Sequence, residues 1–245
     1  MKTIISYLFI SILFFSIHSC GVYYYAPTKQ SVLQFKDKGD ANMAAGYSIA
    51  EEGVVGIDAT IGYAFTEHLA FNSRYQILPN GEDDYIWDNE VIYFNEVEKN
   101  LFFSTNLGFG FGELLTGDDY LNIKIFREYI QSSFGFSNDF FDIAISGRLS
   151  NVHYKVEESM KLRNMYNYNQ FKESYLLEDV GRESFNFFEP SFTIGAGYKG
   201  LKLRYQIGIA AQLDNSNIKY YKDSFSFLYL NASFNITDLF KRKKK

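Results

Sequence analysis

Hydrophobic and polar residues alternate over long stretches of this chain. In segment 101–112, most odd positions hold Leu or Phe, whereas most even positions hold Gly, Ser or Asn. Side chains on a β-strand point alternately to its two faces, so the segment predicts a strand with one apolar face and one face of small or polar residues. Segments 55–65, 69–77 and 201–209 repeat the pattern. The chain is therefore predicted to be an all-β protein.

Ten segments of this kind, some with weaker alternation, divide the chain. The weakest is 88–98, because four acidic or amide residues interrupt its apolar face. An antiparallel barrel of about ten strands is the predicted fold, with eight strands as the alternative. The predicted strands are 41–50, 54–65, 69–78, 88–98, 101–112, 121–137, 140–154, 186–198, 201–212 and 224–236.

The two faces of these strands favour a transmembrane barrel. A strand of about ten residues, tilted at roughly 45°, spans the apolar layer of an outer membrane. A lipid-anchored soluble barrel of lipocalin type is the alternative, but its polar face would meet water and carry many large polar residues. Here the polar face is rich in glycine, which suits a crowded lumen. The glycines concerned are Gly108, Gly110, Gly112, Gly195, Gly197 and Gly208.

The lengths of the connections predict an orientation. Transmembrane barrels place short turns in the periplasm and long loops outside. With an even number of strands, both termini are then predicted to lie in the periplasm. The short turns are 66–68, 99–100, 138–139 and 199–200, and the long polar connections are 79–87, 113–120, 155–185 and 213–223.

The lumen face also carries charges of both signs. An isolated charge in a narrow lumen is costly, so acidic and basic side chains are expected to pair there. Such a network favours a filled lumen over a path for solutes. Its predicted members are Asp58, Arg74, Arg127, Asp142, Arg148, Glu189 and Arg204.

The first residues have the pattern of an export signal. The apolar stretch 4–17 follows a basic Lys2 and is too short to span a bilayer comfortably. Its ending, Ile17-His18-Ser19-Cys20, resembles the lipobox of bacterial lipoproteins and implies lipid modification of Cys20. An ordinary signal peptide followed by an incidental cysteine is the alternative. Cys20 is the only cysteine, which excludes an intramolecular disulfide.

The domain organisation follows from these segments. Residues 1–19 are predicted to be a signal peptide, 20–40 a lipid-anchored tether, 41–236 the barrel and 237–245 a basic periplasmic tail. Outer-membrane lipid is the expected partner. The formal charge of −5 disfavours nucleic acid as a partner.

The chain resembles the small outer-membrane β-barrel proteins common among Bacteroidetes bacteria, many of them lipoproteins of unknown function. The resembling elements are Cys20, the tether ending at 33–40, segment 57–70 and the late segment 189–198. These are strand and turn signatures rather than a binding site. The resemblance therefore implies the fold and the location but no activity.

Few residues offer catalytic chemistry. His153 is predicted near the outer end of the seventh strand, where acidic residues at 83–84 or 118–119 could complete a His–carboxylate pair that activates water. A hydrolase at the rim is thus one alternative function, and a narrow pore for small solutes is another. The protein is nevertheless expected not to be an enzyme, and neither a metal site nor a cofactor is predicted.

Loop 155–185 is the candidate for surface recognition. Its aromatic residues lie among basic and acidic ones, a composition that is frequent in interfaces; a solvated extension of the adjoining strands is the alternative. The sequence thus predicts a lipidated outer-membrane barrel with a structural or surface-interaction role, and an extracellular partner bound through this loop. The aromatic residues are Tyr166, Tyr168, Phe171 and Tyr175.

Overall fold

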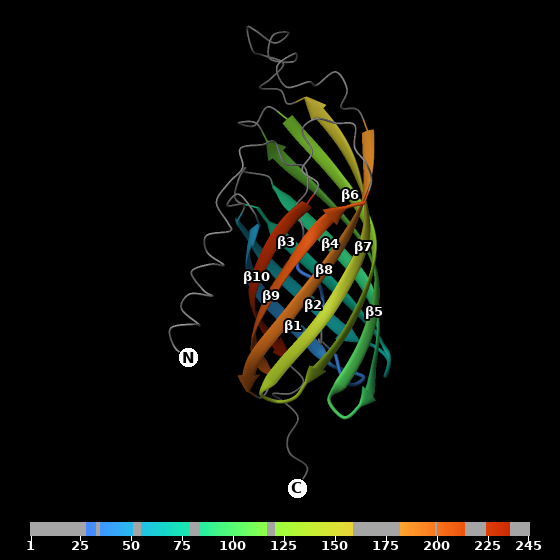
Figure 1. Ribbon diagram of the computed structural model, residues 1–245, viewed down its shortest axis with the longest axis vertical. Coiled ribbons are helices and arrows are strands. Elements are labelled where there is room, and N and C mark those ends of the chain that lie inside the picture. The colour runs from blue at the N-terminus through green and yellow to red at the C-terminus, as the bar shows by residue number, and fades with distance from the viewer. Residues whose placement is uncertain are drawn as a thin grey trace.

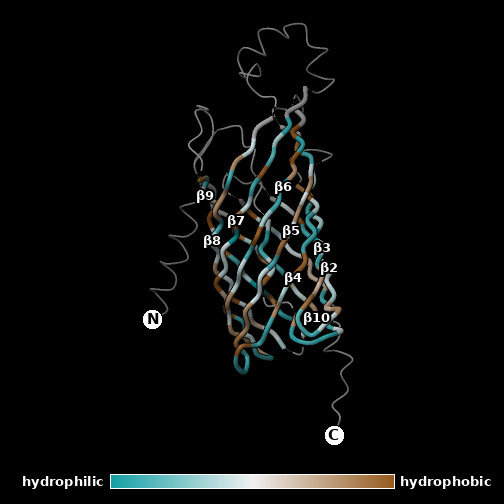
Figure 2. The backbone as a smooth tube through the Cα atoms, turned by 90° about the vertical axis from the view of Figure 1, so that its right-hand side faces the viewer, coloured by the Kyte–Doolittle hydropathy of each residue, from teal (hydrophilic) through white to brown (hydrophobic). Residues whose placement is uncertain are grey.

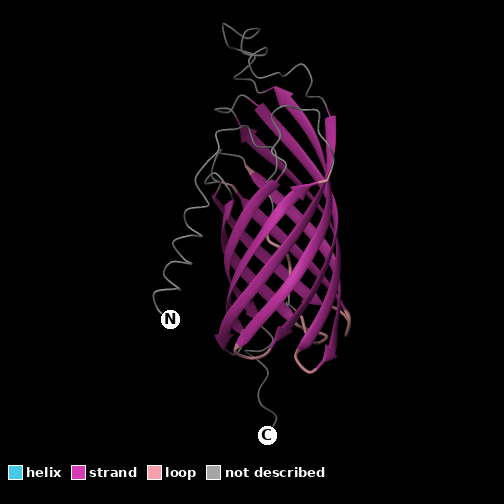
Figure 3. Ribbon diagram, in the orientation of Figure 1, coloured by secondary structure: helices cyan, strands magenta, loops and turns pink. Residues whose placement is uncertain are grey.

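In a computed structural model, the chain forms ten strands that close into a barrel (Figure 1). The structure describes residues 28–32, 35–50, 55–78, 84–116, 121–158, 182–198, 200–213 and 224–235. These residues form strands and loops (Figure 3), and none of them belongs to a helix long and apolar enough to cross a membrane. The strands are β1 (Ala41–Ala50), β2 (Val55–Ala64), β3 (Leu69–Ile77), β4 (Tyr85–Glu98), β5 (Leu101–Thr116), β6 (Leu121–Ser137), β7 (Phe141–Glu158), β8 (Arg182–Tyr198), β9 (Leu201–Gln212) and β10 (Ser224–Asn235).

Every strand pairs antiparallel with its neighbours in the chain, and β1 pairs with β10 to close the barrel. The predicted antiparallel barrel of ten strands is confirmed, and the alternative of eight is wrong. The weakly patterned segment 88–98 belongs to β4. Its pattern is weak because Glu90 is buried on the lumen side and because the register shifts between Glu96 and Glu98.

The outer surface of the barrel carries a broad apolar band. Ile57, Leu107 and Ile145, from three different strands, expose 59%, 63% and 62% of their surface. Figure 2 shows hydrophobic and hydrophilic residues alternating along the strands that carry them. An apolar surface of this extent is unfavourable in water, and it is the surface that lipid hydrocarbon requires of a barrel.

The two faces exchange character at the loop end of β6 and β7. There Ile123 and Val152 are buried in the lumen, whereas Lys124 and Lys155 are exposed on the outside. Strands β5–β8 are the longest and extend beyond the others in Figure 1. The pattern of apolar outside and polar inside therefore ends there. Buried apolar side chains of β5–β8 form one cluster with Leu78 and with residues of β4, β9 and β10. This apolar cluster comprises Leu78, Ile86, Leu114, Ile123, Ile125, Val152, Tyr154, Phe185, Phe187, Ala210 and Tyr229.

Most of the described residues before β1 lie inside the barrel, whereas Asp37 and Lys38 are exposed in the turn that leads into β1. All five residues of 28–32 are buried, and they form part of the loop that the strands enclose in Figure 3. We call residues 28–32 and 35–40 the lumen segment. For residues 28–32 and Phe35 the predicted tether is corrected to an internal plug. The physical reason is that their polar groups find hydrogen-bond partners on the barrel wall, which a free tether would leave to water.

Two glycines of β5 make room for larger side chains in the lumen. A Cβ atom at Gly108 would lie 2.2 Å from the ring of Tyr129, and one at Gly110 would lie 2.1 Å from the carboxylate of Asp88. The missing side chains at these glycines thus leave space in the lumen, and side chains of the neighbouring strands β4 and β6 occupy it.

Replacing Gly108 with Ala is expected to lower the free energy of unfolding by roughly 1–3 kcal/mol, the usual cost of overpacking. Urea titration of the protein folded in lipid vesicles measures this change. Gly147→Ala is the matched control, because a Cβ atom at Gly147 meets only the ring of Phe188, at 3.3 Å. Equal effects of the two substitutions would contradict the steric explanation.

Candidate functional site

Thr28 joins the lumen segment to charged side chains of three strands. Its hydroxyl donates a hydrogen bond to Asp88 Oδ2 at 2.9 Å and accepts one from Arg127. Its carbonyl oxygen accepts a hydrogen bond from Arg148 Nη2 at 2.9 Å. Charge-assisted hydrogen bonds of this kind are stronger than neutral ones, so Thr28 is held firmly at this level of the lumen.

Lys29 brings the only charge of residues 28–32 into the barrel. Its Nζ atom lies 3.2 Å from Asp58 Oδ2 and 3.5 Å from the hydroxyl of Thr60, both on β2. All three side chains are buried. An unpaired buried charge is strongly destabilising. The ion pair between Lys29 and Asp58 therefore allows both charges to be buried inside the lumen.

Gln30 uses both its backbone and its side chain. Its backbone N–H donates to Gln206 Oε1 at 2.8 Å, and its Nε2 donates to the carbonyl oxygen of Glu189 at 2.6 Å. Its Oε1 accepts hydrogen bonds from Ser146 at 2.7 Å and from Ser191 at 3.0 Å. One glutamine thereby links strands β7, β8 and β9.

Ser31 is bonded to the opposite side of the wall. Its hydroxyl donates to Glu90 and accepts from Asn72 Nδ2 at 3.0 Å. Its carbonyl oxygen accepts from Gln131 Nε2 at 2.6 Å and from Asn106 Nδ2 at 3.4 Å. Neighbouring residues of the lumen segment are thus tied to different sides of the barrel.

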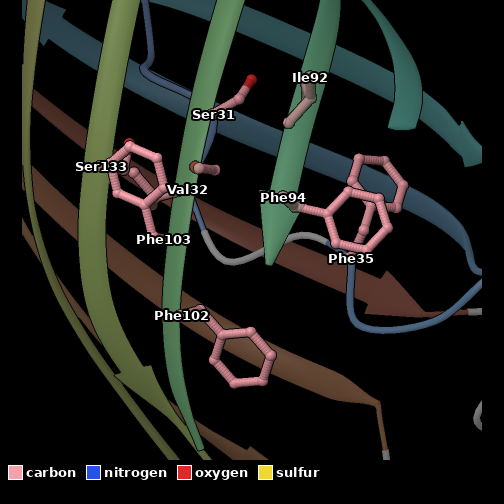
Figure 4. A pocket seen from close by; sticks show the side chains of 9 residues that line it. Ser31, Val32, Phe35, Ile92, Phe94, Phe102, Phe103 and Ser133 are labelled. Carbon is pink, nitrogen blue, oxygen red and sulfur yellow. The ribbon is translucent and has the colours of Figure 1, made fainter. Parts of the chain in front are cut away.

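Beyond Ser31 the lumen segment becomes apolar. Figure 4 shows Val32 and Phe35 beside Phe94 and other apolar side chains of the wall. The ring centroids of Phe35 and Phe94 are 5.9 Å apart, and Lys36 Nζ lies 5.4 Å from the centroid of Phe102. Since Phe102 is the second residue of β5, this part of the segment lies at the end of the barrel with the short turns.

The lumen segment touches the wall on every side. Its hydrogen bonds and ion pairs reach strands β2 to β9, and β1 and β10 contribute Ala44 and Asn231 to a small space beside Lys29. Three spaces between segment and wall each have room for about one or two water molecules. Where residues 28–32 and Phe35 lie, the segment therefore fills the lumen.

Paired charges on the wall surround the segment. Tyr129 lies between two of the cations, with its ring centroid 5.6 Å from Arg127 and 5.1 Å from Arg148. Arg74 Nη2 lies 3.8 Å from both Asp88 and Glu90. The close pairs are Arg127 Nε with Asp88 at 2.9 Å, Arg148 Nε with Glu189 at 3.1 Å, Arg204 Nε with Asp142 at 2.8 Å, and Lys202 with Asp142.

All seven charged residues proposed from the sequence for the lumen are buried there. Two of the pairs form within that set, Arg148 with Glu189 and Arg204 with Asp142. The others use partners that the alternation alone did not assign. Asp58 pairs with Lys29 of the segment, Arg127 pairs with Asp88, and Arg74 lies nearest to Asp88 and Glu90. The signal for Asp88 was available, because it shares the parity of Glu90 and has the opposite parity to the outward-facing Trp87 and Val91 of β4.

The geometry around His153 does not form a hydrolytic site in the described residues. His153 and Glu128 are 46% and 62% exposed on the outside of the barrel, and the nearest approach of His153 Nε2 to Glu128 Oε1 is 4.0 Å. That distance is too long for a hydrogen bond. The ring of His153 instead stacks on Phe126, with centroids 5.8 Å apart.

Several predicted features lie outside the described residues. These include Cys20 with the signal peptide, the basic tail at 237–245, and the aromatic residues Tyr166, Tyr168, Phe171 and Tyr175 of the long loop. Among the residues that the structure describes, no cluster of three or more His, Cys, Asp or Glu side chains is arranged to hold a metal ion.

The sequence matches no protein-family model and no curated protein. The fold is similar to solved barrels of bacterial outer membranes. One is the N-terminal β-barrel domain of Pseudomonas aeruginosa OprF, with 10% identity, coverage of 81% of this chain and 98% of that chain, and a TM-score of 0.35. Another is the outer membrane protease OmpT from Escherichia coli, with 9% identity, coverage of 84% and 99%, and a TM-score of 0.45.

A third similar structure is the KdgM porin, with 10% identity, coverage of 79% of this chain and 98% of that chain, and a TM-score of 0.38. The three proteins include a protease and a porin. The likeness is one of fold, and it leaves the activity of this chain to be argued from its own residues.

Replacing Glu189 with Gln is expected to lower the free energy of unfolding by roughly 3–5 kcal/mol, because it leaves the buried Arg148 without its closest counter-charge. Urea titration in vesicles measures the change. Glu128→Gln is the matched control on the exposed outer face, where the same substitution is expected to change stability by less than about 0.5 kcal/mol. Similar losses in both variants would contradict a buried network.

Proposed function

We propose that this protein is a bacterial outer-membrane barrel closed by its own amino-terminal segment, with a structural or surface-interaction role. The broad apolar band on its outside supports the location, since such a surface needs lipid. The extension of β5–β8 beyond that band supports a role on the side of the long loops, because loops on a rigid barrel commonly carry recognition.

One observation supports a closed lumen. Residues 28–31 form hydrogen bonds with strands all around the inner wall. A pore would need a continuous hydrated path, whereas these side chains are buried and paired with the wall. Polar groups of the inner wall that could line a solute path instead form hydrogen bonds with the segment. The alternative of a narrow pore is therefore not favoured.

The alternative of a hydrolase at the rim has less support. His153 lacks a described carboxylate within hydrogen-bond distance, and its ring rests on Phe126 on the outer face. The proposal of a surface-interaction role therefore rests on the long loops. Recognition through loop 155–185 belongs to the proposal, as does a lipid on Cys20 that would add to membrane attachment.

The connections between strands support an orientation of the barrel. Short turns join β2 to β3, β4 to β5, β6 to β7 and β8 to β9 at one end of the barrel. Transmembrane barrels keep such turns in the periplasm. We therefore place this end, with the last residue of β10, on the periplasmic side and the long loops on the cell surface.

Conductance across a planar lipid bilayer tests the closed lumen. The folded native protein is expected to give no channel events, because the lumen segment blocks the path. A variant in which residues 28–36 are replaced by Gly and Ser is expected to give discrete openings, since it lacks the anchoring groups of Thr28, Lys29 and Gln30.

Channel events from the native protein would overturn the closed state directly. The folded state of each preparation is checked by its β-sheet circular dichroism in vesicles before recording. A control variant that replaces loop residues 165–173 with the same Gly and Ser composition is expected to stay silent, because it leaves the lumen segment intact.

A further inference from the structure

The pairing between the neighbouring strands β8 and β9 (Figure 1) is interrupted within the barrel wall. Phe188 pairs with Ala211 and Ser191 pairs with Gly208 in one continuous register, but the two β8 residues between them form no pair with β9. These two residues are Glu189 and Pro190. Within the described strands, the other ladders have no missing pair except at the register shift between residues 96 and 98 of β4.

Pro190 explains the interruption, because proline has no backbone N–H to donate. Both backbone polar groups of a residue in an antiparallel strand point to the same neighbouring strand. The pairing of β8 with β7 is continuous through Pro190, so the missing donor is on the side of β9. The carbonyl oxygen of Ile209, which faces Pro190 in this register, therefore receives no hydrogen bond from β8.

Beyond the gap, the described residues give the two strands few contacts on the long-loop side. Phe187 and Phe188 pair with the last two residues of β9, and the backbone N–H of Leu213 donates to the carbonyl oxygen of Asn186 at 2.8 Å. Phe187 and Ala210, which belong to the buried apolar cluster, line the inner side of this part. The seam between β8 and β9 is therefore short on this side of the gap, and its inner lining is apolar.

Gln30 of the lumen segment lies at the inner side of the gap. Its Nε2 atom donates to the carbonyl oxygen of Glu189, and its Oε1 atom accepts from Ser191, so its side chain contacts β8 on both sides of Pro190. Its backbone N–H donates to Gln206 of β9, and its carbonyl oxygen accepts from Gln206 Nε2 at 3.3 Å. One residue of the segment is thus bonded to both strands beside the place where the strands are not bonded to each other.

We infer that Gln30 is an internal strap that holds β8 and β9 together at Pro190, and that its release lets the barrel wall open sideways between these strands. The inference rests on the proposed closed lumen, because the strap requires the segment to be in place. It gives the segment a second role besides blocking the lumen. An opening at this seam would join the apolar cluster behind it to the lipid hydrocarbon outside.

Amide hydrogen exchange of the full chain in lipid nanodiscs tests the strap, with peptides from each strand followed by mass spectrometry. Gln30→Ala is expected to raise the exchange rate of peptides 187–194 and 205–212 by about tenfold, because the side-chain hydrogen bonds to β8 are lost. The peptide 69–77 of β3 is expected to be unchanged. Ser31→Ala is the matched control, since it removes hydrogen bonds to β3 and β4 from the adjacent residue and is expected to leave the β8–β9 peptides unchanged.

Pro190→Ala supplies a second arm that does not depend on the folding of the Gln30 variant. This substitution restores an N–H donor opposite Ile209, so exchange of the β8–β9 peptides is expected to slow by about tenfold relative to the native protein. In the Pro190→Ala background, Gln30→Ala is expected to have little further effect on the seam.

Unchanged exchange of the β8–β9 peptides in both single variants would overturn the inference. An equal rise in every strand of Gln30→Ala would also overturn it, because that result reports a general loss of the segment rather than release of one seam. Conductance of the native protein separates the two proposals. A silent native barrel whose seam does not respond to Gln30 would overturn only the strap, whereas channel events would overturn the closed lumen on which the strap rests.

Discussion

Charge pairing inside a narrow lumen is the constraint on which the rest of this structure depends. Ionised groups removed from water need partners close by, and the barrel wall places many of them on its inner face. Lys29 supplies the partner of Asp58 from outside the strands, and Thr28 bridges Asp88, Arg127 and Arg148. Wall and segment therefore form one network, and neither is fully paired without the other.

The outer face follows a second constraint, which is the medium it meets. Along the apolar band, outward side chains are apolar and inward ones are polar, as lipid requires. At the loop end of β6 and β7, Ile123 and Val152 turn inward while Lys124 and Lys155 face out. The outer face of the same sheet therefore suits lipid along the apolar band and water at the loop end. The water-exposed part lies on the side where interactions are proposed.

Much of the fold is predictable from the alternation of apolar and polar residues, because side chains on a strand point to its two faces in turn. The bounds of β6 and β9 agree with their predicted segments, and Arg148 and Glu189 are recognisable as lumen residues from parity. The lumen segment is not predictable in this way. It has no period, and its partners are remote: Gln30 and Gln206 are 176 residues apart. Only the closed barrel brings such groups together.

The most direct test of the filled lumen is a disulfide between the segment and the inner wall. In a Cys20→Ser background, cysteines replacing Ser31 and Asn72, whose side chains hydrogen bond at 3.0 Å, are expected to cross-link on mild oxidation of the membrane-embedded protein. Cysteines replacing Ser31 and Ser73 are the control, because Ser73 faces the outside, where it accepts a hydrogen bond from Trp87. Cross-linking of the first pair alone is the predicted result. Absence of that cross-link, or equal cross-linking of both pairs, would contradict the account.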